Sequence, residues 1–235
     1  MEPILLLHGA ISSSKQMLPL KAELEKDFPS VFTYDFPGHG GKDFTLDPFS
    51  IKCFSESVLK WMDENNFQKI NIFGYSMGGL VALYLAKHYQ EKVNKIITLG
   101  TKLEWDHFIA NDMARMIDAE KISVKAPVLA EALDLMHEPN NWKEVLHRTT
   151  EMFLQLGNHP ELLPNDFDSI HHKVLFLLGA DDRMVTKEET EEIHKRMKNS
   201  QFRILEDTPH PIEQADPVLL AMISKDYFLG NEKFF

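Results

Sequence analysis

The residues best suited to chemistry lie in one short turn, Gly74-Tyr75-Ser76-Met77-Gly78-Gly79. An apolar run, residues 69–73, precedes this turn, and a strongly apolar run with helical character, residues 80–86, follows it. A serine between two glycines in a strand, turn and helix context is typical of an exposed nucleophile, because only small neighbours fit such a strained turn. The turn would hold the Ser76 hydroxyl above the sheet edge, at the positive end of the helix dipole.

A serine hydroxyl is a weak nucleophile, so this interpretation requires a base and a carboxylate that orients the base. His210 follows the last apolar run of the chain, and Asp182 follows the run before it. Both therefore fall on loops that can meet Ser76. From the residues alone, Asp181 stays an alternative carboxylate and His39 an alternative base.

Six short apolar runs alternate with amphipathic stretches, a pattern that predicts parallel strands joined by crossover helices. The runs are 4–8, 31–34, 69–73, 95–99, 173–178 and 201–205. Strands this uniformly apolar belong in a sheet that helices cover on both faces. The expected fold class is therefore α/β, with a mostly parallel sheet of about six strands.

Residues 101–165 interrupt this alternation, because they contain no strand-like run and their apolar residues recur at helical spacing. The first helix should place six apolar side chains on one face: Trp105, Phe108, Ile109, Met113, Met116 and Ile117. We expect a second helix that starts near Pro127 and presents residues 128, 129, 133 and 136. A third should begin with Asn141 and Glu144 in a capping box and stop at Gly157. These helices would form a cap, 101–165, inserted into a core made of 1–100 and 166–235.

Five motifs follow one another at the ends of the predicted strands. They are His8-Gly9-Ala10, Asp35-x-Pro37-Gly38-His39-Gly40, Gly74-x-Ser76-x-Gly78, Gly179-x-x-Asp182 and His210. In this order the chain resembles the α/β-hydrolase superfamily over nearly all of its length outside the cap. The resemblance implies that Ser76 is the nucleophile, His210 the general base and then acid, and Asp182 the carboxylate that fixes the imidazole. Spacing in the family pattern favours Asp182 over Asp181, and chain order favours His210 over His39.

The resemblance also implies an oxyanion hole made by the backbone N–H groups of Ala10 and Met77. Ile11 and Met184 lie next to these groups in the sequence and are candidate pocket residues. The cap offers further large apolar side chains, and we expect a minority of them, about a quarter, to reach the pocket. They are Trp105, Phe108, Met113, Met116, Met136, Met152 and Phe153. Neither a cofactor nor a metal is expected.

The expected activity is therefore hydrolysis of a small-molecule carboxylic ester with a small or medium apolar acyl group, through an acyl-enzyme at Ser76. One alternative is a lyase-type member of the superfamily, similar to the menaquinone-pathway synthases, which share Gly-Tyr-Ser-Met-Gly-Gly. Those relatives carry an arginine next, whereas this chain has Leu80. A second alternative is a ligand receptor that keeps the fold without catalysis.

Composition narrows the partners. The chain has 235 residues, and its 43% hydrophobic and 26% charged content predicts a packed globular protein. Asp and Glu outnumber Lys and Arg by 36 to 25, which gives a formal charge of −11 and disfavours nucleic acid as a partner. A lone cysteine, Cys53, and the lack of a long apolar run predict a cytoplasmic protein without a membrane span.

The first predicted strand carries His8-Gly9, whereas the superfamily usually has two strands before it. We therefore expect a reduced, wholly parallel sheet with an exposed edge strand. Such an edge is either protected by charges or paired with a second subunit. Both a monomer and a homodimer stay open.

Overall fold

The computed structural model describes residues 2–231, and its centre is a parallel sheet of six strands within that range. The strands lie in the order β2-β1-β3-β4-β5-β6, and every neighbouring pair is parallel. Their bounds are β1 (Ile4–Leu7), β2 (Val31–Tyr34), β3 (Ile70–Tyr75), β4 (Val93–Leu99), β5 (Lys173–Asp181) and β6 (Ser200–Pro209). The predicted α/β class and the parallel sheet of about six strands are confirmed.

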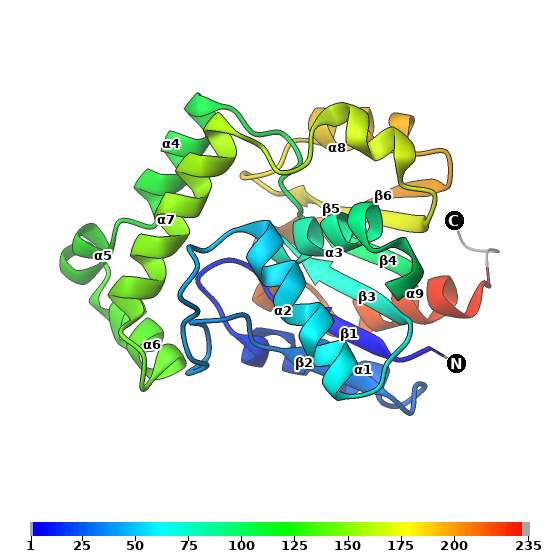
Figure 1. The fold of residues 1–235 in the computed structure, drawn as a ribbon, viewed down its shortest axis with the longest axis horizontal. Helices are drawn as coiled ribbons and strands as arrows, with labels where there is room; N and C mark the ends of the chain where they lie inside the picture. Colours follow the sequence, from blue (N-terminus) through cyan, green and yellow to red (C-terminus); the bar gives the residue numbers. More distant parts are fainter. Residues whose placement is uncertain (1, 232–235) are drawn as a thin grey trace.

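Helices cover both faces of the sheet (Figure 1). Alternation along β1 shows why, because Ile4 and Leu6 belong to one apolar cluster and Leu5 and Leu7 to the other. The first cluster includes side chains of α1 (Leu18–Leu24) and α9 (Pro217–Leu229). The second includes side chains of α2 (Ile51–Glu64), α3 (Met77–His88) and α8 (Lys187–Arg196). Both faces of the strands are therefore buried, as their uniformly apolar sequences require.

The segment between β4 and β5 is helical and extends beyond the carboxyl ends of the strands (Figure 1). It contains α4 (His107–Met116), α5 (Ala119–Lys125), α6 (Pro127–His137) and α7 (Trp142–Asn158). We call these four helices the cap helices. Short 3-10 turns complete the described chain at Ser14–Met17, Gln90–Lys92, Pro164–Ser169 and Ile212–Gln214.

Several local expectations for the cap helices are wrong. The helix expected to stop at Gly157 continues one residue further, to Asn158, and a Cβ at Gly157 would collide with the Cβ of Ala110 on α4. The glycine lets the two helices approach closely. The expected capping box at Asn141 is absent as well: its side chain accepts from the Lys143 amide at 3.0 Å, while Glu144 pairs with Arg148 at 2.7 Å.

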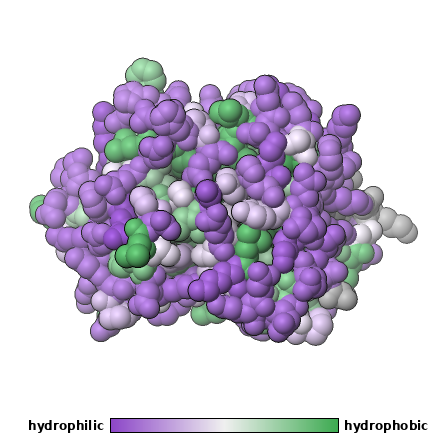
Figure 2. All heavy atoms as spheres, in the orientation of Figure 1, coloured by the Kyte–Doolittle hydropathy of each residue, from purple (hydrophilic) through white to green (hydrophobic). Residues whose placement is uncertain are grey.

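Two side chains assigned to buried helix faces point to solvent instead. Phe108 is 77% exposed and Val128 is 81% exposed. Elsewhere the surface is mostly hydrophilic, with separate apolar spots on the face that Figure 2 shows.

Among the residues that the structure describes, no helix has the length and apolar character needed to cross a membrane.

Candidate active site

Ser76 occupies a sharp turn between β3 and α3. Its backbone has φ +50° and ψ −116°, in a region that residues other than glycine rarely adopt. Two hydrogen bonds hold this conformation: the Ser76 amide donates to the Leu99 carbonyl at 2.8 Å, and the Thr101 hydroxyl donates to the Ser76 carbonyl at 3.1 Å. Neighbouring structure thus fixes the strained turn that the glycine pattern predicts.

The glycines on either side of Ser76 are required by close backbone contacts. A Cβ at Gly74 would lie 2.5 Å from the Gly78 carbonyl oxygen, and a Cβ at Gly78 would lie 2.5 Å from the Leu7 carbonyl oxygen on β1. Real side chains do not tolerate such distances, so larger residues would push α3 away from the sheet. The Gly-x-Ser-x-Gly spacing therefore has a steric cause.

Asp182 and His210 form a buried pair on the loops that follow β5 and β6. Asp182 Oδ2 lies 2.7 Å from His210 Nδ1, and its Oδ1 accepts from the amides of Met184 and Val185 at 2.8 and 2.9 Å. The Asp182 side chain is 2% exposed and that of His210 is 10% exposed. Both carboxylate oxygens are thus engaged, which fixes the orientation of the imidazole.

Gly100, at the end of β4, lets this pair lie close to the sheet. The glycine has φ +57°, and a Cβ there would come within 3.0 Å of Asp182 Oδ2 and 3.2 Å of His210 Nδ1. The alternative carboxylate and the alternative base considered in the sequence lie outside this pair. Asp181 is an exposed residue at the end of β5, and His39 is fully buried against Phe49.

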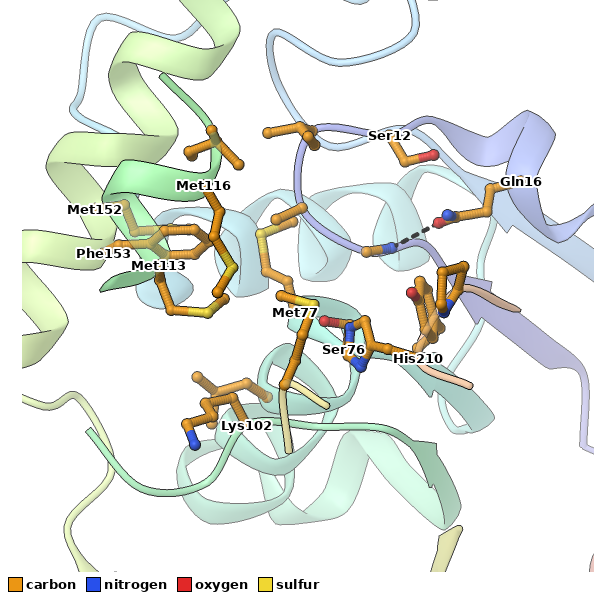
Figure 3. Close-up of a pocket in the computed structure, with 18 of the residues that line it drawn as sticks. Ser12, Gln16, Ser76, Met77, Lys102, Met113, Met116, Met152, Phe153 and His210 are labelled. Atoms are coloured by element: carbon orange, nitrogen blue, oxygen red, sulfur yellow. Dashed lines mark hydrogen bonds between the residues drawn. The ribbon is translucent and has the colours of Figure 1, made fainter. Parts of the chain in front are cut away.

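Ser76 and His210 line the same cavity, and Figure 3 shows their side chains next to each other. The cavity holds about 360 Å³ and lies between the carboxyl ends of the strands and the cap helices. Both predicted pocket residues, Ile11 and Met184, line it. The expectation that a minority of the cap's large apolar side chains would reach the pocket is wrong. Six of the seven line it: Trp105, Met113, Met116, Met136, Met152 and Phe153.

The loop after β1 brings Ala10 to the cavity wall beside Met77, the first residue of α3. In the described part of the chain, neither the Ala10 amide nor the Met77 amide donates to a protein acceptor. His8 Nδ1 lies 2.7 Å from the Gly9 carbonyl oxygen, and the Gly9 amide donates to Gln16 Oε1 at 3.0 Å. These bonds orient the Gly9–Ala10 peptide, whose N–H points away from its carbonyl.

Sequence reasoning missed a cluster of three fully buried histidines beside this loop, His8, His39 and His137. Their ring centroids lie 5.2 Å apart for His8 and His39, and 5.8 Å apart for His39 and His137. Burial lowers the pKa of all three, that of His8 to about 4, so the rings are neutral at pH 7. His137 comes from the cap helices, and no local sequence signal links it to the other two.

Within residues 2–231, no group of three or more His, Cys, Asp or Glu side chains is arranged to hold a metal ion. The three buried histidines contact backbone groups and aromatic rings instead. His39 Nδ1 lies 3.0 Å from the Pro37 carbonyl oxygen, and its ring stacks on Phe49. These contacts indicate that the three rings support the packing beside the loop after β1.

A strained serine turn after a central parallel strand, a His–Asp pair at neighbouring strand ends and helices inserted above them define one class of protein. The chain belongs to the α/β hydrolase fold family, whose model matches residues 2–139.

Comparisons with individual proteins agree with this class. The chain is 24% identical to the pimeloyl-[acyl-carrier protein] methyl ester esterase of Neisseria meningitidis serogroup B, over 97% of this chain and 93% of that protein. Two solved structures share the fold. The enol-lactonase of Burkholderia xenovorans superimposes with a TM-score of 0.77 at 21% identity, covering 97% of this chain and 92% of that one. A thermophilic esterase of Thermogutta terrifontis gives 0.79 at 20% identity, covering 98% and 90%.

Proposed function

We propose that the protein is a serine hydrolase that cleaves carboxylic esters of a small or medium apolar acyl group. One observation carries this proposal: Ser76, held in a strained turn, and His210, oriented by the buried Asp182 side chain, line the same apolar cavity. Esterase and lactonase relatives support ester hydrolysis as the reaction class. The methionine-rich wall supports an apolar acyl group, because methionine adapts to irregular apolar surfaces.

In the first half of the proposed reaction, Ser76 Oγ attacks the ester carbonyl carbon while His210 Nε2 takes the hydroxyl proton. The new C–O bond to Ser76 forms, and negative charge collects on the carbonyl oxygen. The amides of Ala10 and Met77, which have no protein acceptor in the described chain, stabilise that charge. The bond to the alcohol oxygen then breaks, and His210 gives its proton to that oxygen.

In the second half, water attacks the acyl carbon of the acyl-enzyme and passes a proton to His210. The proton returns to Ser76 Oγ as the acyl C–O bond breaks, and the carboxylic acid leaves. Asp182 keeps the imidazole in the tautomer with Nδ1 protonated and stabilises the imidazolium that forms in each half. Each step thus balances with ester and water as the reactants.

The test is hydrolysis of p-nitrophenyl esters from acetate to laurate by wild type and Ser76→Ala. We expect wild-type activity to peak at one chain length and to fall at least 10³-fold in the variant. Ser123→Ala, which removes a hydroxyl bonded within α5, is the matched control and should keep the wild-type rate. If wild type and Ser76→Ala are equally inert, or equally active, the proposed function is wrong.

A further inference from the structure

The walls of the cavity differ in chemistry from one side to the other. Figure 3 shows Met113, Met116 and Met152 on one side of Ser76, and Ser12 and Gln16 on the opposite side. Glu213 lines the cavity as well and is hydrogen-bonded to Gln16. We call Ser12, Gln16 and Glu213 the polar end. An ester bound at Ser76 therefore meets apolar surface in one direction and hydrogen-bonding groups in the other.

Two hydrogen bonds fix the orientation of the Gln16 amide. Its Oε1 accepts from the Gly9 amide at 3.0 Å, and its Nε2 donates to Glu213 Oε1 at 2.8 Å. One N–H of Gln16 and Oε2 of Glu213 keep their bonding capacity, since no other protein partner contacts them among the residues described. The pair thus offers a donor and a charged acceptor side by side.

Ser12 adds an independent sign that this end of the cavity suits a hydrogen-bonding ligand. The residue is only 6% exposed, and its hydroxyl oxygen is buried without a hydrogen-bond partner in the described chain. A buried hydroxyl in that state is destabilising, and native proteins rarely leave one unpaired. Because Ser12 lines the cavity, a ligand bound there can pair with this hydroxyl.

We propose that the polar end binds the alcohol part of the ester, and that this alcohol carries at least one further hydroxyl group, as in 2-hydroxyethyl or glyceryl esters. This inference rests on the proposed function. The leaving alcohol must receive a proton from His210, so it lies on the His210 side of Ser76. Glu213 lies in the 3-10 turn Ile212–Gln214, directly after His210, and Figure 3 shows its partner Gln16 on the same side of the cavity methionines as His210, so the polar end lies on that side.

The mixture of donors and acceptors decides which alcohol fits. A hydroxyl both donates and accepts, so it can satisfy Glu213 while accepting from Gln16 or Ser12. A quaternary ammonium alcohol would satisfy the Glu213 charge but would leave both donors unpaired. A phosphate or carboxylate on the alcohol would meet the Glu213 carboxylate and a chain of formal charge −11, which repel it.

The experiment measures kcat/KM for hexanoate esters that share one acyl group and differ in the alcohol: ethyl, 2-hydroxyethyl, 1-glyceryl and choline. The readout is the ratio of 2-hydroxyethyl to ethyl ester, because any general damage to the site cancels in that ratio. We expect a ratio of at least ten in wild type, since a hydrogen bond to a charged group gives that much discrimination. Glu213→Leu and Ser12→Ala should each lower the ratio towards one.

Glu206→Leu is the matched control, because Glu206 is an exposed glutamate on β6 outside the cavity lining. It should keep the wild-type ratio. Thermal melts verify folding of each variant, and Ser12→Ala tests the inference even if Glu213→Leu fails to fold.

Three results would overturn the inference. A ratio near one with good ethyl ester turnover refutes the hydroxyl subsite and leaves the proposed function intact. A preference for the choline ester assigns the polar end to a cationic alcohol instead. Failure to hydrolyse any ester, with Ser76→Ala indistinguishable from wild type, refutes the proposed function and this inference with it.

Discussion

Replacement of His137 by phenylalanine removes a contact that ties a cap helix to the loop bearing Ala10. His137 is the last residue of α6 and is fully buried. Its Nδ1 accepts from the Gly40 amide at 3.2 Å, and its Nε2 lies 3.1 Å from the Ile11 carbonyl oxygen, to which it donates. Ile11 has φ +53°, so this loop needs outside support to keep its strained backbone.

The expected loss follows from the two partners that the substitution leaves behind. A phenyl ring fills a similar volume but can neither accept from Gly40 nor donate to Ile11. Each buried backbone group left without a partner costs about 1–3 kcal/mol, so the two groups together should lower the free energy of unfolding of His137→Phe by about 2–6 kcal/mol. For a chain of this size that corresponds to a fall in Tm of about 4–24 °C.

Thermal melts at pH 7.5, followed by circular dichroism, measure the loss directly. His147→Phe is the matched control, since His147 lies on the neighbouring α7 with its side chain 65% exposed. Ester kinetics provide the second readout: because the loop carries the Ala10 amide, kcat should fall more than KM rises. A Tm loss no larger than that of His147→Phe would refute the role assigned to His137.

Three further predictions follow. Stability should fall as pH drops from about 6.5 towards 4, because burial holds the pKa of His8 at about 4 and the unfolded chain binds the extra proton; the slope is about 1.4 kcal/mol per pH unit for each such histidine. Above pH 6.5 this contribution is constant. Tm should therefore be lower at pH 5.5 than at pH 7.5, and this difference in Tm should be smaller in His39→Phe. Met113→Trp, which narrows the apolar side, should shift the preferred p-nitrophenyl ester to a shorter acyl chain, and an unchanged profile would contradict the acyl assignment. Gly157→Ala should lower the free energy of unfolding by about 1–3 kcal/mol through its collision with Ala110, and adding Ala110→Gly should recover part of the loss in the same melts.

The sheet and the positions of the candidate catalytic side chains could be predicted because each depends on local sequence. Apolar runs identified every strand within the described residues, with end points shifted by a few positions. The turn at Ser76 was predictable because its glycine pattern is local in sequence: Gly74 is required by contacts within the strand, turn and helix unit, although Gly78 is required by the neighbouring strand β1. Spacing in the family's motif then favoured Asp182 over Asp181 as the carboxylate, a choice that residue type alone left open.

The cap helices were harder to predict because their contacts join distant segments. Periodicity placed Phe108 on a buried face, yet α4 turns that side chain to solvent while Met113 and Met116 line the cavity. Gly157 has the residue type of a helix stop, but its role comes from Ala110, which is 47 residues earlier in the chain. A one-dimensional pattern cannot distinguish a terminating glycine from one that lets two helices approach.

The two sides of the cavity should contribute unequally to substrate choice. An apolar wall distinguishes acyl groups only by the area they bury, and a single methylene changes selectivity about 10- to 200-fold at most. Flexible methionines reduce that further, since their side chains follow the shape of the ligand. A buried group that must hydrogen-bond discriminates more sharply, because a substrate lacking the matching hydroxyl leaves it unpaired, and the Ser12 hydroxyl is such a group. Ser12 is therefore expected to set the alcohol more strictly than the cap methionines set the acyl chain, with Gln16 and Glu213 as the more exposed partners of the same hydroxyl.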